Sequence, residues 1–228
     1  KMYNKIPLDK LEQLKNGEYK KSKPIVNFYD YSPDYGNIRS EGRIAFNSGK
    51  KPIKMLKQLL NMIKEKDYIV LDFFSGSAST AHAVMSLNSE DNGKRQYMLV
   101  QIPEKCEGNV DMEREGFHTI CDLGEERIRK TAKKIKEETN ADIDYGFRVY
   151  KIDTSNMKDV YYEPSKLEQT QLNMFETNIK EERTSKDLLT QVILDLGLTL
   201  DLNIEEKEIL NNKVYFVAGN SLVACFDN

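Results

Sequence analysis

The chain has 228 residues, enough for one large domain or for a medium domain with a small one, and its 39% hydrophobic residues can supply a core without disulfides or metal. A formal net charge of -3 argues against a stand-alone nucleic-acid-binding protein, because such proteins usually carry a basic surplus. Three cysteines outside any CxxC pair are typical of a cytoplasmic protein with reduced thiols, and two scattered histidines are too few for a metal cluster. No apolar run reaches membrane-spanning length, so no membrane partner is expected.

The first 42 residues are polar and interrupted by prolines and glycines, which predicts irregular structure with a strand over residues 24–29. The pattern sharpens after Lys51. Pro52 suits the first turn of a helix, where its missing N–H is not needed, and apolar residues then recur on one helical face. A helix is therefore predicted from Pro52 to Asp67.

A continuous apolar run over residues 68–74 predicts a strand that is buried on both faces, as in a parallel sheet. Small residues over 75–79 follow and lead into a helix that starts near Thr80, and residues 97–102 form a second run of the same kind. Strand, helix and strand in this order predict a right-handed crossover between parallel strands. The predicted fold class is therefore α/β, with a Rossmann-like, doubly wound and mostly parallel sheet.

The second half of the chain predicts a long helix and a small separate unit. Thr119 is predicted to cap a helix that runs to about Glu138, and a strand is expected over residues 147–152. Ser185 is predicted to cap a further helix that Gly197 ends. Three short strands with hairpin turns between them follow, over residues 204–210, 214–218 and 222–226. The predicted organisation is an irregular segment (1–42), an α/β domain (43–153), a linker (154–184) and a small α+β unit (185–228).

The loop after the first buried strand has a composition that brings backbone close to a ligand. Gly76 permits backbone conformations closed to other residues, and its small neighbours let a cofactor lie against the main chain. The helix start at Thr80 attracts carboxylate or phosphate groups. Asp72 can accept hydrogen bonds from the loop or from a ligand ammonium group, and Glu104 after the second strand can accept both ribose hydroxyls of an adenosine. These residues predict a nucleotide-like cofactor, although the loop fits neither the dinucleotide fingerprint nor the P-loop.

Several stretches resemble the β-group amino-methyltransferases, and most of all the modification (Mod) subunits of type III restriction–modification systems. Residues 72–84 (DFFSGSASTAHAV) are similar to the motif with which that family binds S-adenosyl-L-methionine (AdoMet). The other similar stretches are residues 47–52, 87–88 with 91–93, 99–104, 116–120, 126–128, 146–149 and 221–227. The resemblance covers residues 43–228 and implies part of an AdoMet-dependent methyltransferase fold.

The resemblance also implies a reaction and its participants. The reaction would be methyl transfer from AdoMet to N6 of adenine in duplex DNA, with the target base flipped out of the helix. The implied partners are duplex DNA, held through a recognition region, and, in a full-length protein, the restriction (Res) subunit and a second Mod subunit. The residues implied in cofactor binding are Lys51, Asp72, Phe74, Gly76, Ser77, Ser79, Thr80 and Glu104. Phe74 is expected against the cofactor and Glu104 on its ribose, whereas Lys51 could equally be a solvated lysine at a helix start.

The sequence departs from the family in two places. Ala78 stands where the family usually has a second glycine, which leaves room for the cofactor only if φ is below zero at that position. The catalytic motif Asp/Asn/Ser-Pro-Pro-Tyr/Phe/Trp is absent from the sequence, so no catalytic residue is assigned. Residues 32–35 (SPDY) imitate it, but Asp replaces the second proline and a turn is the favoured interpretation. The chain is therefore expected to be a fragment that binds AdoMet weakly and is inactive alone.

Two other functions stay open. The chain could be a truncated, non-catalytic subunit that serves as a protein-interaction module, or another Rossmann-like enzyme that uses a dinucleotide. The basic side chains of the helix after Thr119 could touch DNA phosphates, but the glutamates on either side of them favour a solvated helix face. These basic residues are Arg127, Arg129, Lys130, Lys133, Lys134 and Lys136.

Overall fold

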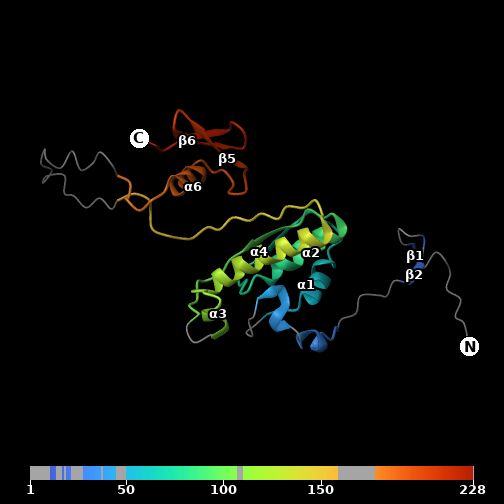
Figure 1. Cartoon of the computed structure of the whole chain (residues 1–228). Helices are drawn as coiled ribbons and strands as arrows, with labels where there is room; N and C mark the ends of the chain where they lie inside the picture. The colour runs from blue at the N-terminus through green and yellow to red at the C-terminus, as the bar shows by residue number, and fades with distance from the viewer. Residues whose placement is uncertain are drawn as a thin grey trace, which may run out of the picture. The chain divides into compact units, whose positions relative to one another are not determined.

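The structure is a computed structural model, and it describes residues 11–13, 17, 19–21, 28–36, 38–44, 50–106, 110–158 and 178–227. Contacts divide the chain into two compact units, Lys1–Phe147 and Arg148–Asn228 (Figure 1). The strand expected over residues 24–29 falls largely outside the described residues, as does much of the expected linker.

The first unit is a parallel β–α–β arrangement with further helices. Its elements in chain order are β1 (Leu11–Gln13), β2 (Tyr19–Lys21), η2 (Ser32–Tyr35), η3 (Ile38–Arg43), α1 (Ile53–Leu60), β3 (Ile69–Asp72), α2 (Ser79–Asp91), β4 (Gln96–Leu99), α3 (Val110–Arg114) and α4 (Ile120–Thr139). Strands β1 and β2 pair antiparallel, whereas β3 and β4 pair parallel with Asp72 opposite Leu99. The parallel strand pair joined by a helix is thus confirmed. Residues 32–35 form one 3₁₀ turn with proline near its start.

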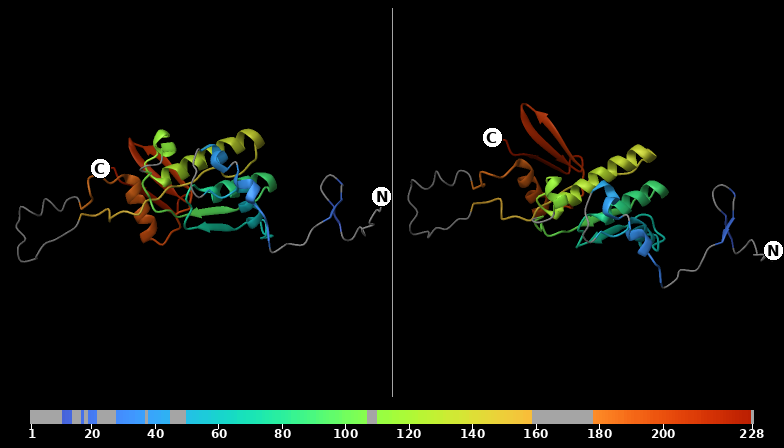
Figure 2. Two further views of the ribbon diagram at one scale, coloured as in Figure 1. Left: turned by 90° about the horizontal axis from the view of Figure 1, so that it is seen from below. Right: turned by 60° about the horizontal axis from the view of Figure 1, so that its bottom comes forward.

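Helix α2 lies at the centre of this unit and is buried on most of its surface. Ala81 and Met85 form one core cluster with Ile128 and Ile135 of α4, and Tyr97 and Leu99 of the strands pack against it. The views in Figure 2 show the helices gathered over one side of the β3–β4 pair. The core therefore sits between this pair and α2 with α4.

The opposite face of the β3–β4 pair is exposed, so the prediction of strands buried on both faces is wrong. Alternate residues of each strand point away from the helices: Ile69 and Leu71 are 62% and 57% exposed, and Met98 is 56% exposed. No helix among the described residues packs on this side. The apolar runs in the sequence indicated two hydrophobic faces. In the described residues, helices cover only one of these faces.

Helix α1 is shorter than predicted, because it ends at Leu60 rather than near Asp67. The Asn61 N–H still bonds the Lys57 carbonyl at 2.9 Å, and turns follow. The Tyr68 hydroxyl donates to the Leu60 carbonyl at 2.9 Å, which satisfies a carbonyl of the last turn. The apolar pattern in the sequence continues beyond Leu60, whereas the helix ends at this residue.

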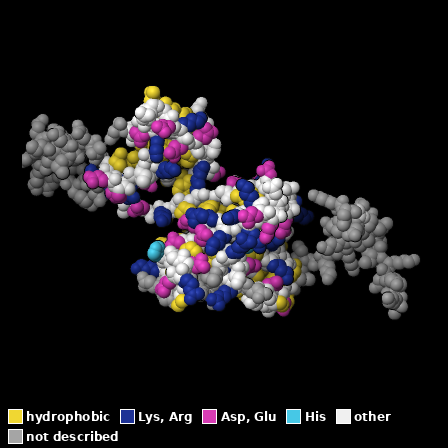
Figure 3. Space-filling model, viewed as in Figure 1, with side chains coloured by type: hydrophobic (Ala, Val, Ile, Leu, Met, Phe, Trp, Pro, Cys, Tyr) yellow, Lys and Arg dark blue, Asp and Glu magenta, His cyan; other side chains and the backbone are white. Residues whose placement is uncertain are grey.

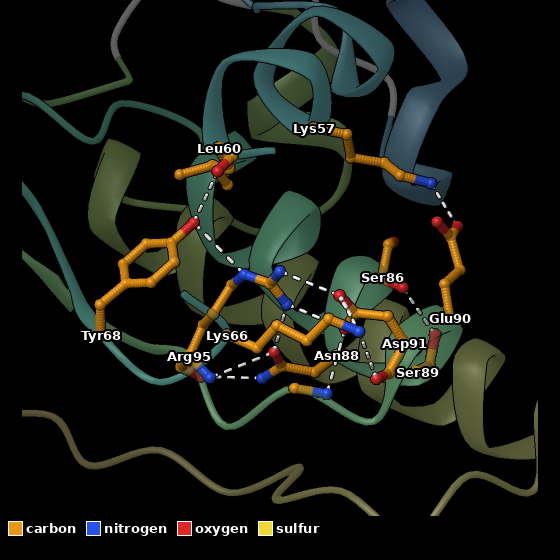
Figure 4. A network of polar contacts seen from close by, with 11 residues as sticks. Lys57, Leu60, Lys66, Tyr68, Ser86, Asn88, Ser89, Glu90, Asp91 and Arg95 are labelled. Atoms are coloured by element: carbon orange, nitrogen blue, oxygen red, sulfur yellow. Dashed lines mark hydrogen bonds and ion pairs between the residues drawn. The ribbon is translucent and has the colours of Figure 1, made fainter. Parts of the chain in front are cut away.

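A closed polar network joins the end of α2 to β4 around Arg95 (Figure 4). The Arg95 side chain is 1% exposed, and its Nη1 and Nη2 donate to the two Asp91 carboxylate oxygens at 2.9 and 3.0 Å. Its Nε donates to the Tyr68 hydroxyl at 3.3 Å. Asn88 bonds the Arg95 backbone twice, donating to the carbonyl at 2.8 Å and accepting from the N–H at 3.2 Å. Every guanidinium nitrogen of Arg95 therefore has a partner.

The predicted cap of α4 is confirmed. The Thr119 hydroxyl accepts from the Asp122 N–H at 3.3 Å, and the Asp122 carboxylate accepts from the Thr119 N–H at 2.8 Å. This reciprocal pair satisfies two backbone donors of the first turn and fixes where the helix begins.

The strand predicted over residues 147–152 is wrong, since these residues are all described and none lies in a strand. Phe147 instead packs against the core of the first unit, with the Arg129 guanidinium 5.3 Å over its ring. In the second unit, Arg148 Nη2 donates to the Leu202 carbonyl at 2.6 Å and the Tyr150 hydroxyl donates to the Leu200 carbonyl at 2.9 Å. Side-chain contacts thus replace the backbone ladder that a strand requires.

The second unit is a helix on a three-stranded antiparallel sheet. Its elements are α6 (Ser185–Asp195), β5 (Ile204–Ile209), β6 (Asn212–Val217) and β7 (Leu222–Cys225), with strand order β5-β6-β7. Thr184 rather than Ser185 caps α6, because its hydroxyl reaches the Asp187 N–H at 3.3 Å. The helix and the three strands predicted for this part of the chain are confirmed, and their buried core consists of Leu189, Ile193, Tyr215 and Val217.

Candidate cofactor site

The loop between β3 and α2 is held at the carboxyl ends of the two parallel strands. Gly76 adopts a positive φ of 50°, a conformation that glycine takes without strain. The Ser75 N–H donates to the Val100 carbonyl at 3.3 Å, and the Gly76 N–H donates to Oε1 of Gln101 at 2.8 Å. Gln101 follows β4, so the residues after both strands meet at one edge of the pair. This is the edge where open α/β sheets bind ligands.

Asp72 ties the two ends of this loop together. One carboxylate oxygen accepts from the Phe74 N–H at 3.2 Å, and the other accepts from the Thr80 hydroxyl at 2.6 Å. Two predicted site residues, Asp72 and Thr80, are thus in direct contact. The carboxylate has the loop role foreseen for it, and its contact with a ligand ammonium group stays a prediction.

Arg127 of α4 clamps the same loop from behind. Its Nη1 donates to the hydroxyls of Ser77 and Ser79 at 2.9 and 2.8 Å. Both serines are buried, at 5% and 6% exposure, so their hydroxyls shape the loop through this arginine. The start of α2 has no side-chain cap, because Ala78 at the N-cap has no polar side chain.

Arg127 is an exception to the prediction that the basic run of α4 is a solvated face, because it is buried while Arg129, Lys133 and Lys136 are exposed as expected. Its side chain is 0% exposed, and its nearest carboxylate is Glu41 of η3, whose Oε2 lies 3.6 Å from Nη2. Burial lowers the pKa of Arg127 to about 10. The Glu41 carboxylate also accepts from the Ile53 N–H at 3.2 Å, at the start of α1. One network therefore joins η3, α1, α4 and the loop.

Ala78 adopts a left-handed conformation with φ +56°. Alanine was expected to leave room for the cofactor only if φ at this position were below zero, and this condition is not met. Ala78 is 2% exposed. Across from it, α4 carries Gly124, where an added Cβ would lie 3.3 Å from the Gly76 carbonyl and 3.5 Å from the Ala78 Cβ. The lack of a side chain at Gly124 lets α4 approach the loop closely.

Two adjacent lysines precede α1 and differ in their surroundings. Lys50 is 3% exposed, and its ammonium group donates to the carbonyls of Arg39, Glu41 and Ile44. Burial lowers the pKa of Lys50 to about 8. Lys51, the residue that the resemblance implies in cofactor binding, is exposed. Lys50 therefore has a structural role, and cofactor binding by Lys51 stays a prediction.

Phe74 and Glu104 are both available to a ligand. Phe74 is 77% exposed, with its ring centroid 5.2 Å from that of Phe73. Glu104 is exposed and lies three residues after Gln101 in the sequence. The contact of Glu104 with a ribose stays a prediction.

Sequence reasoning missed Gln101, Arg127, Glu41 and Gly124. Helical spacing held a signal for one of them, because Arg127 lies four residues from both Leu123 and Thr131, and all three are buried. A glycine inside a helix pattern is likewise a known sign of close packing. The contacts of Gln101 and Glu41 depend on tertiary structure and had no local signal.

The residues at this edge fit AdoMet. Its sulfonium and ammonium groups are cationic, and the nearby carboxylates of Asp72 and Glu104 suit a cation. Arg127, the cation that bonds the loop among the described residues, is fully buried behind it and leaves no basic side chain of the clamp for a phosphate. An exposed aromatic ring at Phe74 offers a stacking surface for an adenine.

Neither metal nor membrane chemistry is indicated by the described part of the chain. No three His, Cys, Asp or Glu side chains among the described residues come together to hold a metal ion. Of the helices in the described residues, none is long and apolar enough to cross a membrane.

A parallel β–α–β unit with a glycine-bearing loop at its strand ends defines the class of domains that bind nucleotide-like cofactors. The chain belongs to the DNA methylase family, which it matches over residues 2–134, more than half of its length. The matched region contains β3, the loop, α2, β4 and most of α4.

Curated relatives carry more specific names. The chain is 34% identical over 151 residues to the type III restriction-modification enzyme StyLTI Mod subunit of Salmonella typhimurium, covering 63% of this chain and 23% of that protein. It is 28% identical to the EcoP15I Mod subunit of Escherichia coli over 94% of this chain and 35% of the relative. It is 26% identical to the EcoPI Mod subunit of Escherichia phage P1 over 96% and 36%. The matches span between about a quarter and a third of these relatives.

Proposed function

We propose that this chain is the AdoMet-binding part of a DNA adenine-N6 methyltransferase of a type III restriction–modification system. The observation that carries the proposal is the loop held by Gln101 and Arg127 at the ends of β3 and β4, in a chain of the DNA methylase family. The relatives named Mod subunits support the type III assignment. AdoMet supplies the methyl group that is transferred.

The proposed roles follow from the geometry of the loop. Gly76 and its neighbours bring the main chain against the methionine part of the cofactor, and Asp72 keeps the loop closed through Phe74 and Thr80. Phe74 stacks on the adenine ring, and Glu104 accepts the ribose hydroxyls. Arg127 acts from behind, by orienting Ser77 and Ser79. Lys51 contacts the cofactor from the start of α1.

We also propose that the exposed face of β3 and β4 is completed by the rest of the methyltransferase domain in a longer protein. The face is apolar along both strands and their extensions, which is unusual for a surface that stays in water. Its exposed side chains are Ile69, Leu71, Phe73, Met98, Val100 and Ile102. The chain spans about a third of the EcoP15I and EcoPI Mod subunits, so such relatives have ample chain for a second covering layer and further strands. The completed sheet would be the doubly wound, mostly parallel sheet that the sequence predicts.

Catalysis in this proposal needs residues that the sequence lacks. No Pro-Pro pair occurs in the 228 residues, so a motif that accepts the adenine amine and stacks on the flipped base must come from elsewhere in a full-length protein. The same applies to DNA recognition, because the chain has a net charge of -3 and little electrostatic attraction for phosphates. Duplex DNA, a Res subunit and a second Mod subunit are the proposed partners of the full-length protein, and its free cysteines suit a reducing cytoplasm.

The test is tritiated methyl transfer from AdoMet to mixed-sequence duplex DNA, with thermal melting in the presence of AdoMet as a second readout. The chain alone is expected to show a small AdoMet-dependent rise in melting temperature and no sustained methylation. A longer protein that contains both this chain and a Pro-Pro-aromatic motif is expected to methylate adenine. Sustained turnover by the chain alone would contradict the proposal and would make Tyr35→Ala the next variant to test.

One observation favours a second candidate, a protein-interaction module. The exposed apolar face of β3 and β4 could dock a separate protein without any cofactor. AdoMet would then leave the melting temperature unchanged. A dinucleotide enzyme is less favoured, because the loop lacks the three spaced glycines of the dinucleotide fingerprint, and a larger shift with NAD than with AdoMet would support it.

A further inference from the structure

Arg127 contacts two segments that lie far apart in the sequence, the cofactor loop and η3. Its Nη1 donates to the hydroxyls of Ser77 and Ser79 at 2.9 and 2.8 Å. Its Nη2 lies 3.6 Å from a carboxylate oxygen of Glu41. Because the arginine side chain is 0% exposed, water screens these contacts little. The position of Glu41 therefore bears on the two serines through one buried side chain.

Gly42 brings η3 directly onto the side chain of Arg127. It has a φ of +79°, and an added Cβ would lie 2.5 Å from Nε and 3.0 and 3.1 Å from Cγ and Cδ of Arg127. A residue without a side chain allows this close approach. Any larger residue would press on an arginine whose guanidinium group is bonded to Ser77 and Ser79.

Contacts outside the loop fix the place of Glu41. Its carboxylate accepts from the Ile53 N–H at 3.2 Å, at the start of α1. The buried ammonium group of Lys50 donates to three carbonyls of this segment, those of Arg39, Glu41 and Ile44. The segment that faces Arg127 is thus anchored to α1 by both its side-chain and its backbone groups.

Other ion pairs of α4 lie at its surface. Lys130 lies 3.6 Å from a Glu115 carboxylate oxygen, the same distance as in the pair of Arg127 with Glu41. The side chains of Lys130 and Glu115 are 31% and 43% exposed. Figure 3 shows Lys and Arg side chains, with acidic ones between them, over the surface where α4 lies in Figure 1. Such exposed pairs contribute little, whereas Glu41 differs from them because its partner is buried.

We propose that Glu41 and Gly42 are positioning residues of the cofactor loop and act on it through Arg127. This inference deepens the proposed function and rests on it. Glu41 balances the buried charge and Gly42 packs on the arginine stem, so that Nη1 stays where it reaches both Ser77 and Ser79. The cofactor site thereby extends from the loop, through α4, to η3.

Glu41→Gln separates the charge from the shape. The amide oxygen still accepts from the Ile53 N–H, but the buried Arg127 loses the carboxylate at 3.6 Å and should change its position. AdoMet affinity measured by calorimetry should fall about threefold, while Glu115→Gln, the control with the same ion-pair distance, should leave it unchanged. In an Arg127→Met background, Glu41→Gln should have no further effect. A further loss there would show that Glu41 acts without Arg127 and would overturn the proposal, as would unchanged affinity in Glu41→Gln alone.

Gly42→Ala tests the steric contact. Gly116 supplies the matched control, because it also has a φ of +79° but an added Cβ there meets nothing within 4 Å. Both alanine variants strain the backbone in the same way, and Gly42→Ala also presses on Arg127. AdoMet affinity should therefore fall about tenfold in Gly42→Ala and stay unchanged in Gly116→Ala. Equal affinities in the two variants would contradict the proposal.

A measurement without AdoMet separates this inference from the proposed function. In the ligand-free chain, Glu41→Gln should shift the backbone amides of residues 77–80 in NMR spectra, whereas Glu115→Gln should leave them in place. If these amides shift but the unmodified chain does not bind AdoMet, the coupling of Glu41 to the loop stands and the proposed function fails. If the unmodified chain binds AdoMet and the amides of residues 77–80 stay in place in Glu41→Gln, the inference alone is overturned.

Discussion

Two buried arginines hold the two ends of helix α2, and their surroundings differ. Arg95 at the carboxyl end has partners for every guanidinium nitrogen, from Tyr68, Asn88 and Asp91. Arg127 at the amino end bonds Ser77 and Ser79 through Nη1, while among the described residues its Nε and Nη2 have no hydrogen-bond partner and Nη2 lies 3.6 Å from a Glu41 carboxylate oxygen. A hydrogen-bond network in which every polar atom has a partner stabilises a fold. A buried polar atom without a partner costs free energy, and a ligand that supplies the partner removes this cost. We therefore expect a structural role at the carboxyl end of α2 (the closed end) and, under the proposed function, the cofactor site at its amino end (the open end).

The largest expected effect is on stability at the closed end. Arg95→Met removes the partner of Asp91 and leaves the buried Asn88 without part of its network, so the free energy of unfolding should fall by about 2–3 kcal/mol. Urea unfolding measures this. The control is Arg129→Met, whose arginine is 53% exposed and pairs with Glu125 on the helix surface, and it should cost under about 0.5 kcal/mol. If Arg95→Met lost no more stability than Arg129→Met, the structural role of the Arg95 network would be contradicted.

The next effect is on AdoMet binding at the open end. Arg127→Met keeps the volume of the buried side chain, so stability should change by less than about 1 kcal/mol. The loop loses its clamp on Ser77 and Ser79, and calorimetry should show AdoMet affinity about tenfold lower. Arg127→Lys should recover part of the affinity through one remaining donor. An Arg127→Met protein with normal AdoMet affinity would show that the clamp does not position the loop.

A smaller effect is expected at Ala78, the left-handed residue beside this clamp. Ala78→Gly removes about 1 kcal/mol of backbone strain but also a buried methyl group worth about 0.8 kcal/mol, so stability should stay nearly constant. AdoMet affinity should rise a few-fold, because glycine lets the loop adjust to the cofactor. Ala83→Gly, inside the same helix, is the control and should cost about 1 kcal/mol without raising affinity. Lower affinity in Ala78→Gly would show that alanine suits this loop.

The smallest expected effect is a pH dependence of stability that arises at the carboxyl end of α2, around Arg95. The hydrogen bond from Arg95 holds the pKa of Asp91 below its ordinary value of 3.8. Its stabilisation is thus complete above pH 3.8 and is lost as the pH falls through the lower pKa of the folded state. Unfolding measured on either side of pH 3.8 should show a larger loss in the wild type than in Arg95→Met, in which Lys66 still pairs with Asp91 at 3.3 Å. An identical acid response in both proteins would contradict the assignment.

The same comparison explains what the sequence predicted. Local signals located β3, the loop, α2 and the capped start of α4 at Thr119, because strand, helix and cap patterns are encoded within a few residues. They did not reveal that Arg127 is buried, since charged residues around it suggested a solvated face. The missing strand over residues 147–152 and the exposed face of β3 and β4 share a cause. Both depend on whether another layer or strand is present, and alternation of side chains cannot show this.

The most direct test of the account is an amide map of AdoMet binding by NMR. Saturating AdoMet should shift the backbone amides of residues 73–80 and 101–104, at the end of α2 that Arg127 clamps. The amides around Arg95, at the other end of the same helix, should stay in place. Shifts centred on Arg95, or none near Gly76 at saturating AdoMet, would contradict the claim that the open end of α2 is the cofactor site.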